Sequence, residues 1–172
     1  MNKIQIIFVL FLILGCKSNK NTSEQSGAYL KEISCPDSGN CEFEVLRNSV
    51  LNVRTDEFGK LYPEVTPGNK VVIKFHYKKT VPEKVMDANY SEFVYLEVNE
   101  YEPQLILKDK ELQKVKMLFG RICFCRGAMG YFRVTRGSLF LFNIKGKLKM
   151  DLTFEVDNIP QIITEVKEEI NY

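Results

Sequence analysis

Residues 147–156 alternate polar and apolar side chains without interruption, and this pattern constrains the fold more than any other feature of the sequence. The apolar positions are Leu148, Met150, Leu152, Phe154 and Val156. A period of two places successive side chains on opposite faces of an extended strand. One face of this strand is therefore expected to be buried and the other to meet water, which is typical of antiparallel sheets.

Similar segments follow each other closely along the rest of the chain. The clearest cover residues 71–77, 94–98, 131–136 and 139–144, and shorter ones cover 43–45, 51–53, 105–107 and 122–125. Residues typical of turns separate them, notably at 47–49, 66–69, 126–130 and 145–146. We therefore expect an antiparallel β-sandwich or β-barrel of about eight short strands, with at most one or two short helices.

Two segments fit more than one structure. In 109–119, Leu112, Val115 and Leu118 have helical spacing, and we favour a short helix or an irregular loop there. Residues 158–172 could form a terminal helix that begins near Pro160, or could contain an edge strand over residues 161–166.

Composition supports a mostly-β chain and excludes several classes of protein. Alanine, the best helix former, occurs only three times in 172 residues, whereas β-branched and aromatic residues are frequent. Hydrophobic residues make up 45% of the chain, too many for a disordered protein. The only long apolar run lies at the N-terminus, which excludes a polytopic membrane protein.

That N-terminus has the anatomy of a secretory signal peptide. A basic start, Met1-Asn2-Lys3, precedes an apolar run over residues 4–14 that only Gln5 interrupts. As a helix this run spans about 16 Å, roughly half of a bilayer's hydrocarbon core, so a stable transmembrane helix is not expected. We expect residues 1–15 to be removed as a signal peptide.

The end of this run, Ile13-Leu14-Gly15-Cys16, resembles the lipobox of bacterial lipoproteins. The resemblance implies that the peptide is cleaved before Cys16 and that Cys16 is acylated. A cysteine with two or three acyl chains would hold the protein on a membrane almost permanently. The chain resembles small lipoproteins of the Bacteroidota type, and no functional family is recognised.

The lipoprotein resemblance also carries an expected location. Lys17 follows the cysteine where an aspartate would signal inner-membrane retention, and residues 17–21 lack the acidic residues associated with surface export. We expect a protein anchored to the outer membrane and facing the periplasm. Residues 16–34 are polar and are expected to form the lipidated cysteine and a flexible tether, followed by a single β domain over residues 35–172.

Four further cysteines, Cys35, Cys41, Cys123 and Cys125, suggest two disulfides in an oxidising compartment. If Cys123 and Cys125 both lie in one strand, their Cα atoms are about 6.6 Å apart with parallel side chains, too far for an unstrained bridge. We therefore predict crossed linkage, with each of Cys35 and Cys41 bound to one of Cys123 and Cys125. The spacings do not match the usual zinc patterns, and no metal site is expected.

Charge is concentrated in one stretch. Residues 104–149 carry eleven lysines and arginines against two acidic residues. The candidate basic patch consists of Lys114, Lys116, Arg121, Arg126, Arg133, Arg136, Lys145, Lys147 and Lys149. It could hold an anionic glycan, a lipid headgroup or an acidic protein, or its members could pair with acidic neighbours across the sheet. Nucleic acid is not expected, because the protein is expected in the cell envelope.

Catalytic motifs are absent from the sequence. His76, the only histidine, lies in an outward row between Lys74 and Lys78, where a surface role is expected rather than a general base. No nucleophile elbow, phosphate loop or cofactor motif occurs. The sequence therefore favours a non-catalytic binding or structural domain. The alternatives are a hydrolase with a site assembled across strands, and a cysteine-based redox or metal protein.

Overall fold

The computed structural model describes residues 35–82, 88–144 and 146–171. The expected signal peptide, Cys16 and the tether up to residue 34 lie outside these residues. The described residues form one 3₁₀ helix, η1 (Asp109–Val115), and nine strands: β1 (Gly39–Thr55), β2 (Leu61–Lys79), β3 (Tyr90–Val98), β4 (Gln104–Lys108), β5 (Leu118–Cys123), β6 (Gly130–Arg133), β7 (Arg136–Ile144), β8 (Lys147–Glu155) and β9 (Glu165–Asn171).

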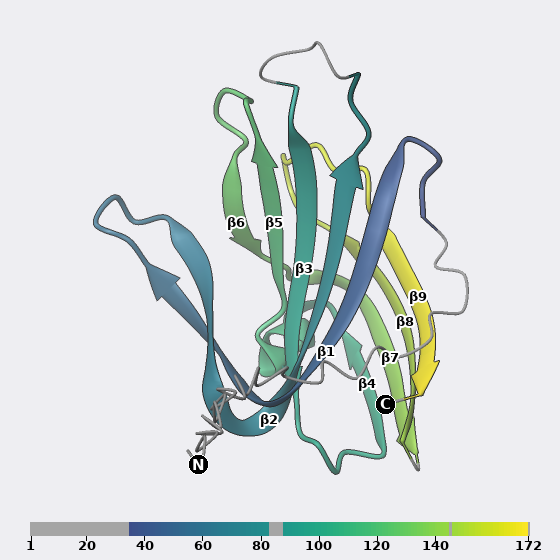
Figure 1. Ribbon diagram of the computed structural model, residues 1–172. Coiled ribbons are helices and arrows are strands. Elements are labelled where there is room, and N and C mark those ends of the chain that lie inside the picture. Colours follow the sequence, from purple (N-terminus) through teal and green to yellow (C-terminus); the bar gives the residue numbers. More distant parts are fainter. Residues whose placement is uncertain (1–34, 83–87, 145, 172) are drawn as a thin grey trace, which may run out of the picture.

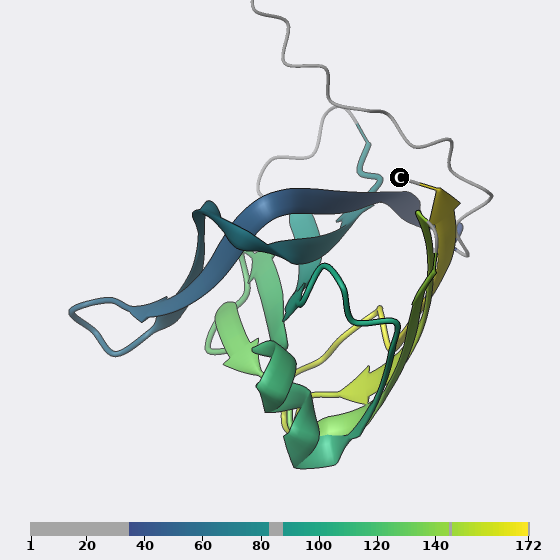
Figure 2. The same cartoon turned by 90° about the horizontal axis from the view of Figure 1, so that it is seen from below.

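The strands form two antiparallel sheets that face each other (Figures 1 and 2). Sheet A has the order β1-β2-β3-β5-β6, and sheet B has the order β4-β7-β8-β9. This is the expected mostly-β antiparallel architecture, and its two layers correspond to a β-sandwich.

The main core lies between the two sheets. The alternating residues of β8 are all buried, as the period of two predicts, and so are those of β2 from Val71 to Tyr77. Phe119 of sheet A packs against Phe154 of sheet B, with ring centroids 5.6 Å apart. Because one face of each strand is buried here, the polar residues between these positions lie on the outer faces of the sandwich.

β1 and β2 form a long hairpin that contains an irregularity in both strands. Register shifts surround Ser49, which pairs with both Pro67 and Lys70, and Asn48 has a positive φ of 50°. The turns predicted at 47–49 and 66–69 are therefore wrong. Gly, Pro and Asn are accommodated there in a β-bulge, and the chain continues in the same direction on either side.

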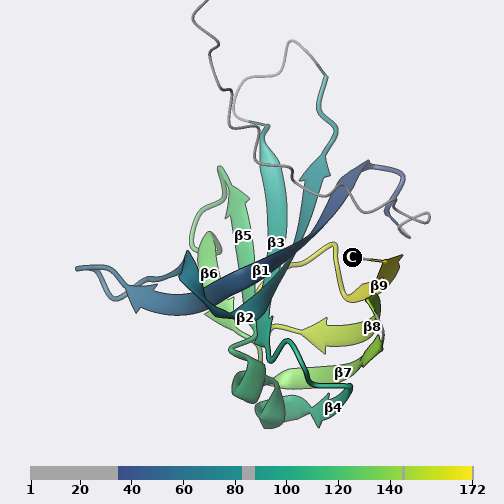
Figure 3. The same ribbon diagram turned by 60° about the horizontal axis from the view of Figure 1, so that its bottom comes forward.

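Beyond the bulge, residues 49–67 form an arm that projects from the sandwich (Figures 2 and 3). The base of the arm is tied to sheet A: Glu97 accepts hydrogen bonds from the main-chain N–H of Leu51 and from Lys116, each at 2.8 Å. The chain reverses at the tip, where the Asp56 carboxylate accepts N–H bonds from Phe58 and Lys60. Leu61 then pairs with Tyr131 of β6, so the arm curves back toward the far edge of sheet A.

The structure settles the two ambiguous segments. Residues 109–115 form the 3₁₀ helix η1, with Leu112 and Val115 buried, which confirms the expected short helix. At the C-terminus residues 165–171 form strand β9, so the helix alternative is wrong and the strand begins later than the predicted 161–166.

Candidate functional site

The outer face of sheet A carries a row of residues that crosses all five strands. The strand registers place Glu42 opposite His76, His76 opposite Phe93, Phe93 opposite Gly120, and Gly120 opposite Tyr131. We call these five residues the transverse row. His76, Phe93 and Tyr131 are half-buried, so part of each ring remains accessible.

The aromatic rings of this row contact each other. His76 and Phe93 stack with centroids 4.3 Å apart and planes only 7° from parallel, and Phe93 lies 6.5 Å from Tyr131. Gly120 permits this arrangement because it has no side chain: a Cβ there would lie 2.4 Å from the Tyr131 ring. The rings therefore form a continuous apolar strip along the row.

Polar groups lie beside the rings. A parallel row on the same face, two residues along each strand, contains Glu44, Lys74 and Tyr95. Lys74 donates to the Glu44 carboxylate at 2.6 Å, and the Tyr95 ring lies 6.3 Å from that of Tyr131. Burial, followed by the charge of Glu44, raises the pKa of Tyr95, and burial raises the pKa of Tyr131 to about 12. Both hydroxyls are therefore protonated at neutral pH and can donate hydrogen bonds.

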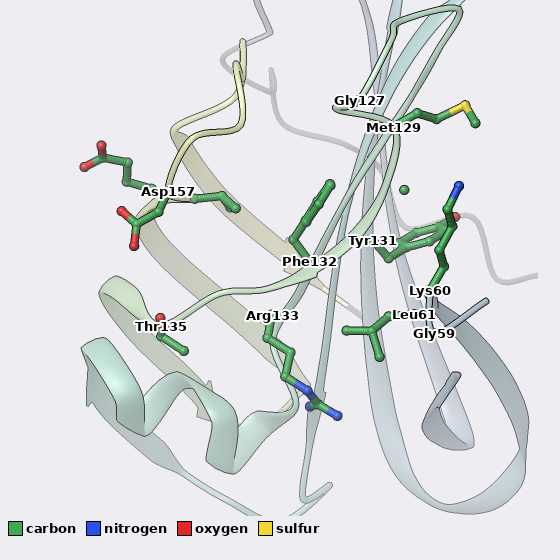
Figure 4. Close-up of a pocket in the computed structure, with 13 residues that line it drawn as sticks. Gly59, Lys60, Leu61, Gly127, Met129, Tyr131, Phe132, Arg133, Thr135 and Asp157 are labelled. Atoms are coloured by element: carbon green, nitrogen blue, oxygen red, sulfur yellow. The ribbon is translucent and has the colours of Figure 1, made fainter. Parts of the chain in front are cut away.

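An open cavity of about 620 Å³ adjoins the row at Tyr131 (Figure 4). The arm contributes Lys60 and Leu61 to its lining, and the β5–β6 hairpin contributes Met129, Tyr131 and Arg133. The close-up shows Tyr131, Lys60 and Leu61 together on one side of β6 and Asp157 on the other. A ligand on the transverse row could therefore extend into this cavity between the arm and β6.

His76 also connects two polar residues of neighbouring strands. Its Nε2 lies 3.3 Å from the Ser91 hydroxyl, and its Nδ1 lies 3.5 Å from a Glu42 carboxylate oxygen. Ser91 additionally lines a smaller cavity of about 190 Å³ together with Ile122 and Phe124. A hydroxyl, an imidazole and a carboxylate in this order correspond to a nucleophile, a base and an orienting group.

A buried polar network lies on the inner face of sheet A, where β3 begins and β5 ends. The Glu92 carboxylate accepts hydrogen bonds from the Tyr90 hydroxyl and, at 2.7 Å each, from the main-chain N–H groups of Ile162 and Ile163. Arg121 donates to the Tyr90 hydroxyl at 3.2 Å. Burial, followed by the bond to Glu92, raises the pKa of Tyr90 to about 12, so its hydroxyl keeps its proton. The network fastens the β8–β9 loop to sheet A.

The members of the predicted basic patch lie at separate places, and several are paired. Lys114 contacts Glu111, Lys116 contacts Glu97, Arg136 contacts Glu155 and Asp157, and Lys147 contacts Glu169. Arg121 is buried, and Arg133 donates to Gln113. Arg126 is exposed in the β5–β6 turn, Lys149 lines a hollow on sheet B with Phe142, and Lys145 lies outside the described residues. Of the eight members that the structure describes, Arg133 alone lines the cavity beside the transverse row.

The predicted crossed disulfides are wrong. The structure pairs Cys35 with Cys41 and Cys123 with Cys125, with Cα atoms 5.7 and 5.2 Å apart. The prediction assumed that residues 122–125 form one extended strand. β5 instead ends at Cys123, and the chain bends at Phe124, which brings Cys125 back toward Cys123. Both bridges are consequently local, and neither joins the start of the domain to the β5–β6 hairpin.

Neither a metal-binding cluster nor a membrane-spanning helix occurs among the residues that the structure describes. No group of three or more His, Cys, Asp or Glu side chains there is arranged to hold a metal ion. Within the same residues no helix has the length and apolar character needed to cross a membrane.

Sequence reasoning placed His76 on an outer face with a surface role and named none of its neighbours as site residues. Alternation places Phe93 and Tyr95 on the face opposite the core, so their outward position could have been predicted. The contacts of Ser91 and Glu42 with His76, and of Tyr131 with Phe93, depend on strand order and register, which alternation does not specify. Relatives of known function offer no further guide to this site: no protein-family model matches the chain, and neither a curated protein nor a solved structure shows significant similarity to it.

Proposed function

We propose that the chain is a lipid-anchored cell-envelope lipoprotein whose β domain binds an anionic glycan on the outer face of sheet A. The lipobox-like sequence ending in Cys16 supports the anchor. A Cys16→Ala change is expected to block processing and to release the protein from the membrane fraction. Unchanged fractionation would contradict the anchor.

The transverse row is the observation that carries the binding proposal. Sugars present apolar C–H faces and polar hydroxyl edges, and a strip of aromatic rings with hydroxyl, carboxylate and ammonium groups beside it complements both. His76, Phe93 and Tyr131 supply the rings, while Lys74 and Glu44 lie next to them.

Charge favours an anionic glycan over a neutral one. Lys60 and Arg133 line the adjoining cavity, and Lys78 is exposed on β2 one row away from His76. A uronic acid carboxylate bound over Tyr131 would lie within the field of these cations. The acidic residues at the far side of the cavity, Glu155 and Asp157, are already bound to Arg136.

Replacing Tyr131 by alanine is expected to weaken binding of polygalacturonate about tenfold, because a stacked ring contributes on the order of 1 kcal/mol beyond its buried area. Isothermal titration calorimetry measures the change, with dextran as the uncharged comparison polymer. Tyr101→Ala is the matched control, since Tyr101 is 90% exposed in the β3–β4 loop. Equal affinity in the two variants, or equal binding of dextran, would contradict the proposal.

The Ser91–His76–Glu42 geometry supports a second candidate function, an envelope esterase. His76 Nε2 would accept the Ser91 proton as the hydroxyl attacks an ester carbonyl, the alcohol would leave with that proton, and water would release the acyl group. This candidate ranks second because Ser91 pairs with strands on both sides, so the ladder occupies main-chain N–H groups that could stabilise an oxyanion.

For the esterase, Ser91→Ala is expected to lower the hydrolysis rate of p-nitrophenyl acetate about a thousandfold, while Tyr101→Ala leaves it unchanged. Glu42→Gln, which keeps the shape of the orienting group, is expected to give a smaller loss. Turnover that persists in Ser91→Ala, or no turnover by the wild-type protein, would exclude this activity.

A further inference from the structure

One end of the sandwich gathers the start of β1, the end of β2 and the β5–β6 hairpin (Figure 1). Gly39 pairs with Lys79, and the Thr80 N–H donates to the Ser38 carbonyl at 2.9 Å. Tyr90, the first residue of β3, pairs with Cys123, the last residue of β5. The bonds from the β8–β9 loop to Glu92 bring that loop to the same region. We call this part of the molecule the N-terminal end, because the described chain begins there.

Several large apolar side chains are exposed at the N-terminal end. Phe124 is 85% exposed at the bend between the two bridged cysteines, and Ile122 lines a small cavity with it. Met129 in the β5–β6 hairpin and Ile162 in the β8–β9 loop are also partly exposed. The Cys123–Cys125 bridge fixes the backbone on both sides of Phe124, so this ring stays outside the fold. Exposed aromatic and aliphatic side chains at a loop tip are poorly solvated and favour an apolar environment.

Exposed cations lie at the same end of the sandwich. Lys78 and Lys79 are exposed at the end of β2, and Arg126 is exposed beside Phe124. Two exposed acidic residues, Asp37 and Glu42, lie in the same region, and Glu42 faces His76. Apolar side chains flanked by lysine and arginine match the chemistry of a bilayer surface, where the apolar groups enter the acyl boundary and the cations contact anionic headgroups.

The connection of the N-terminal end to the proposed anchor favours a membrane as its partner. Only residues 17–34 separate Cys35 from Cys16, and eighteen residues span at most about 60 Å. The tether from an anchor at Cys16 joins the domain at Cys35, so the N-terminal end adjoins the tether, whereas Tyr101 lies in the β3–β4 loop at the opposite end. We infer that the N-terminal end docks on the lipid surface, with Phe124 inserted at the acyl boundary. This inference rests on the anchor proposed at Cys16.

The chain contains no tryptophan, so a single introduced tryptophan reports its own surroundings. The mature lipidated protein is reconstituted into vesicles of phosphatidylcholine and phosphatidylglycerol, with or without bromine on the acyl chains. The tryptophan of Phe124→Trp is expected to emit at a shorter wavelength on the vesicles. Brominated acyl chains are expected to quench most of its fluorescence. Tyr101→Trp, equally exposed but at the opposite end, is the matched control and is expected to keep its emission.

The outcomes separate docking from anchoring. If the protein floats with the vesicles and Phe124→Trp is not quenched, docking is overturned and the anchor stands. Equal quenching of the two variants would also overturn docking, because the domain would then have no preferred orientation. If the protein does not float with the vesicles, the anchor fails and the docking that rests on it fails too.

Discussion

Replacing Glu92 by alanine is expected to lower the free energy of unfolding by about 3–5 kcal/mol, the cost of removing one partner from a buried charged network. Glu92 is fully buried, and the change leaves two main-chain N–H groups without an acceptor. It also removes the acceptor of the Tyr90 hydroxyl and the negative charge opposite Arg121 in the strand register. Urea unfolding at pH 7 measures the loss.

Two further variants show whether the network itself is responsible. Glu92→Gln retains the side-chain shape and one acceptor, so an intermediate loss of about 1.5–3 kcal/mol is expected. Glu64→Ala breaks the exposed pair with Arg54 and is expected to cost less than about 1 kcal/mol. A loss in Glu92→Ala no larger than that in Glu64→Ala would show that the β8–β9 loop is held by other contacts.

The core faces of the strands could be predicted from the sequence, because alternation follows directly from the geometry of an extended chain. Leu148, Met150, Leu152, Phe154 and Val156 are all buried, as predicted. On β2, Lys74, His76 and Lys78 lie on the opposite face from the core, also as predicted. Two layers of antiparallel strands follow from many such segments with short connections.

Predictions failed where a local bend replaced regular strand geometry. The crossed disulfides assumed that Cys125 continues the strand of Cys123, but the bend at Phe124 makes the local bridge accessible. The turns expected at 47–49 and 66–69 are a bulge, since the same residue types permit both. A sequence pattern identifies residues that tolerate irregular backbone without specifying which irregularity forms.

The candidate site was predictable only in part for a different reason. Alternation places His76 and Phe93 on the outer face, but their stacking requires that β2 and β3 pair in one particular register. Tyr131 reaches the row because Gly120 leaves space for its ring. These contacts join residues 11 to 38 positions apart on different strands, so they depend on tertiary packing, which no local pattern encodes.

The C-terminal strand shows how one residue can obscure a pattern. On β9, Val166, Glu168 and Ile170 all point into the sandwich, and the charged residue in the middle interrupts the apolar alternation that identifies a strand. Glu168 is 5% exposed, and one of its carboxylate oxygens has no hydrogen-bond partner among the described residues. Burial raises the pKa of Glu168 from 4.5 to about 7.

This carboxyl is expected to make the protein less stable as pH rises. Between pH 4.5 and 7 the folded chain binds a proton at Glu168 that the unfolded chain has lost, so the free energy of unfolding falls with pH across that window. Each pH unit corresponds to 1.36 kcal/mol, so the free energy of unfolding falls by about 3 kcal/mol in total between pH 4.5 and 7. Below pH 4.5 the group is protonated in both states and contributes no pH dependence.

Glu168→Gln is therefore expected to raise the free energy of unfolding by about 3 kcal/mol at pH 8 and to change it little at pH 4, because the amide resembles the protonated acid. Urea unfolding at both pH values measures the difference. Glu169→Gln is the matched control: Glu169 follows on the same strand and contacts Lys147 on the outer face. Glu169→Gln removes a partly exposed ion pair, so it is expected to lower the free energy of unfolding at pH 8 by less than about 1 kcal/mol. Equal effects of Glu168→Gln at pH 4 and pH 8 would show that this side chain reaches water in the folded protein.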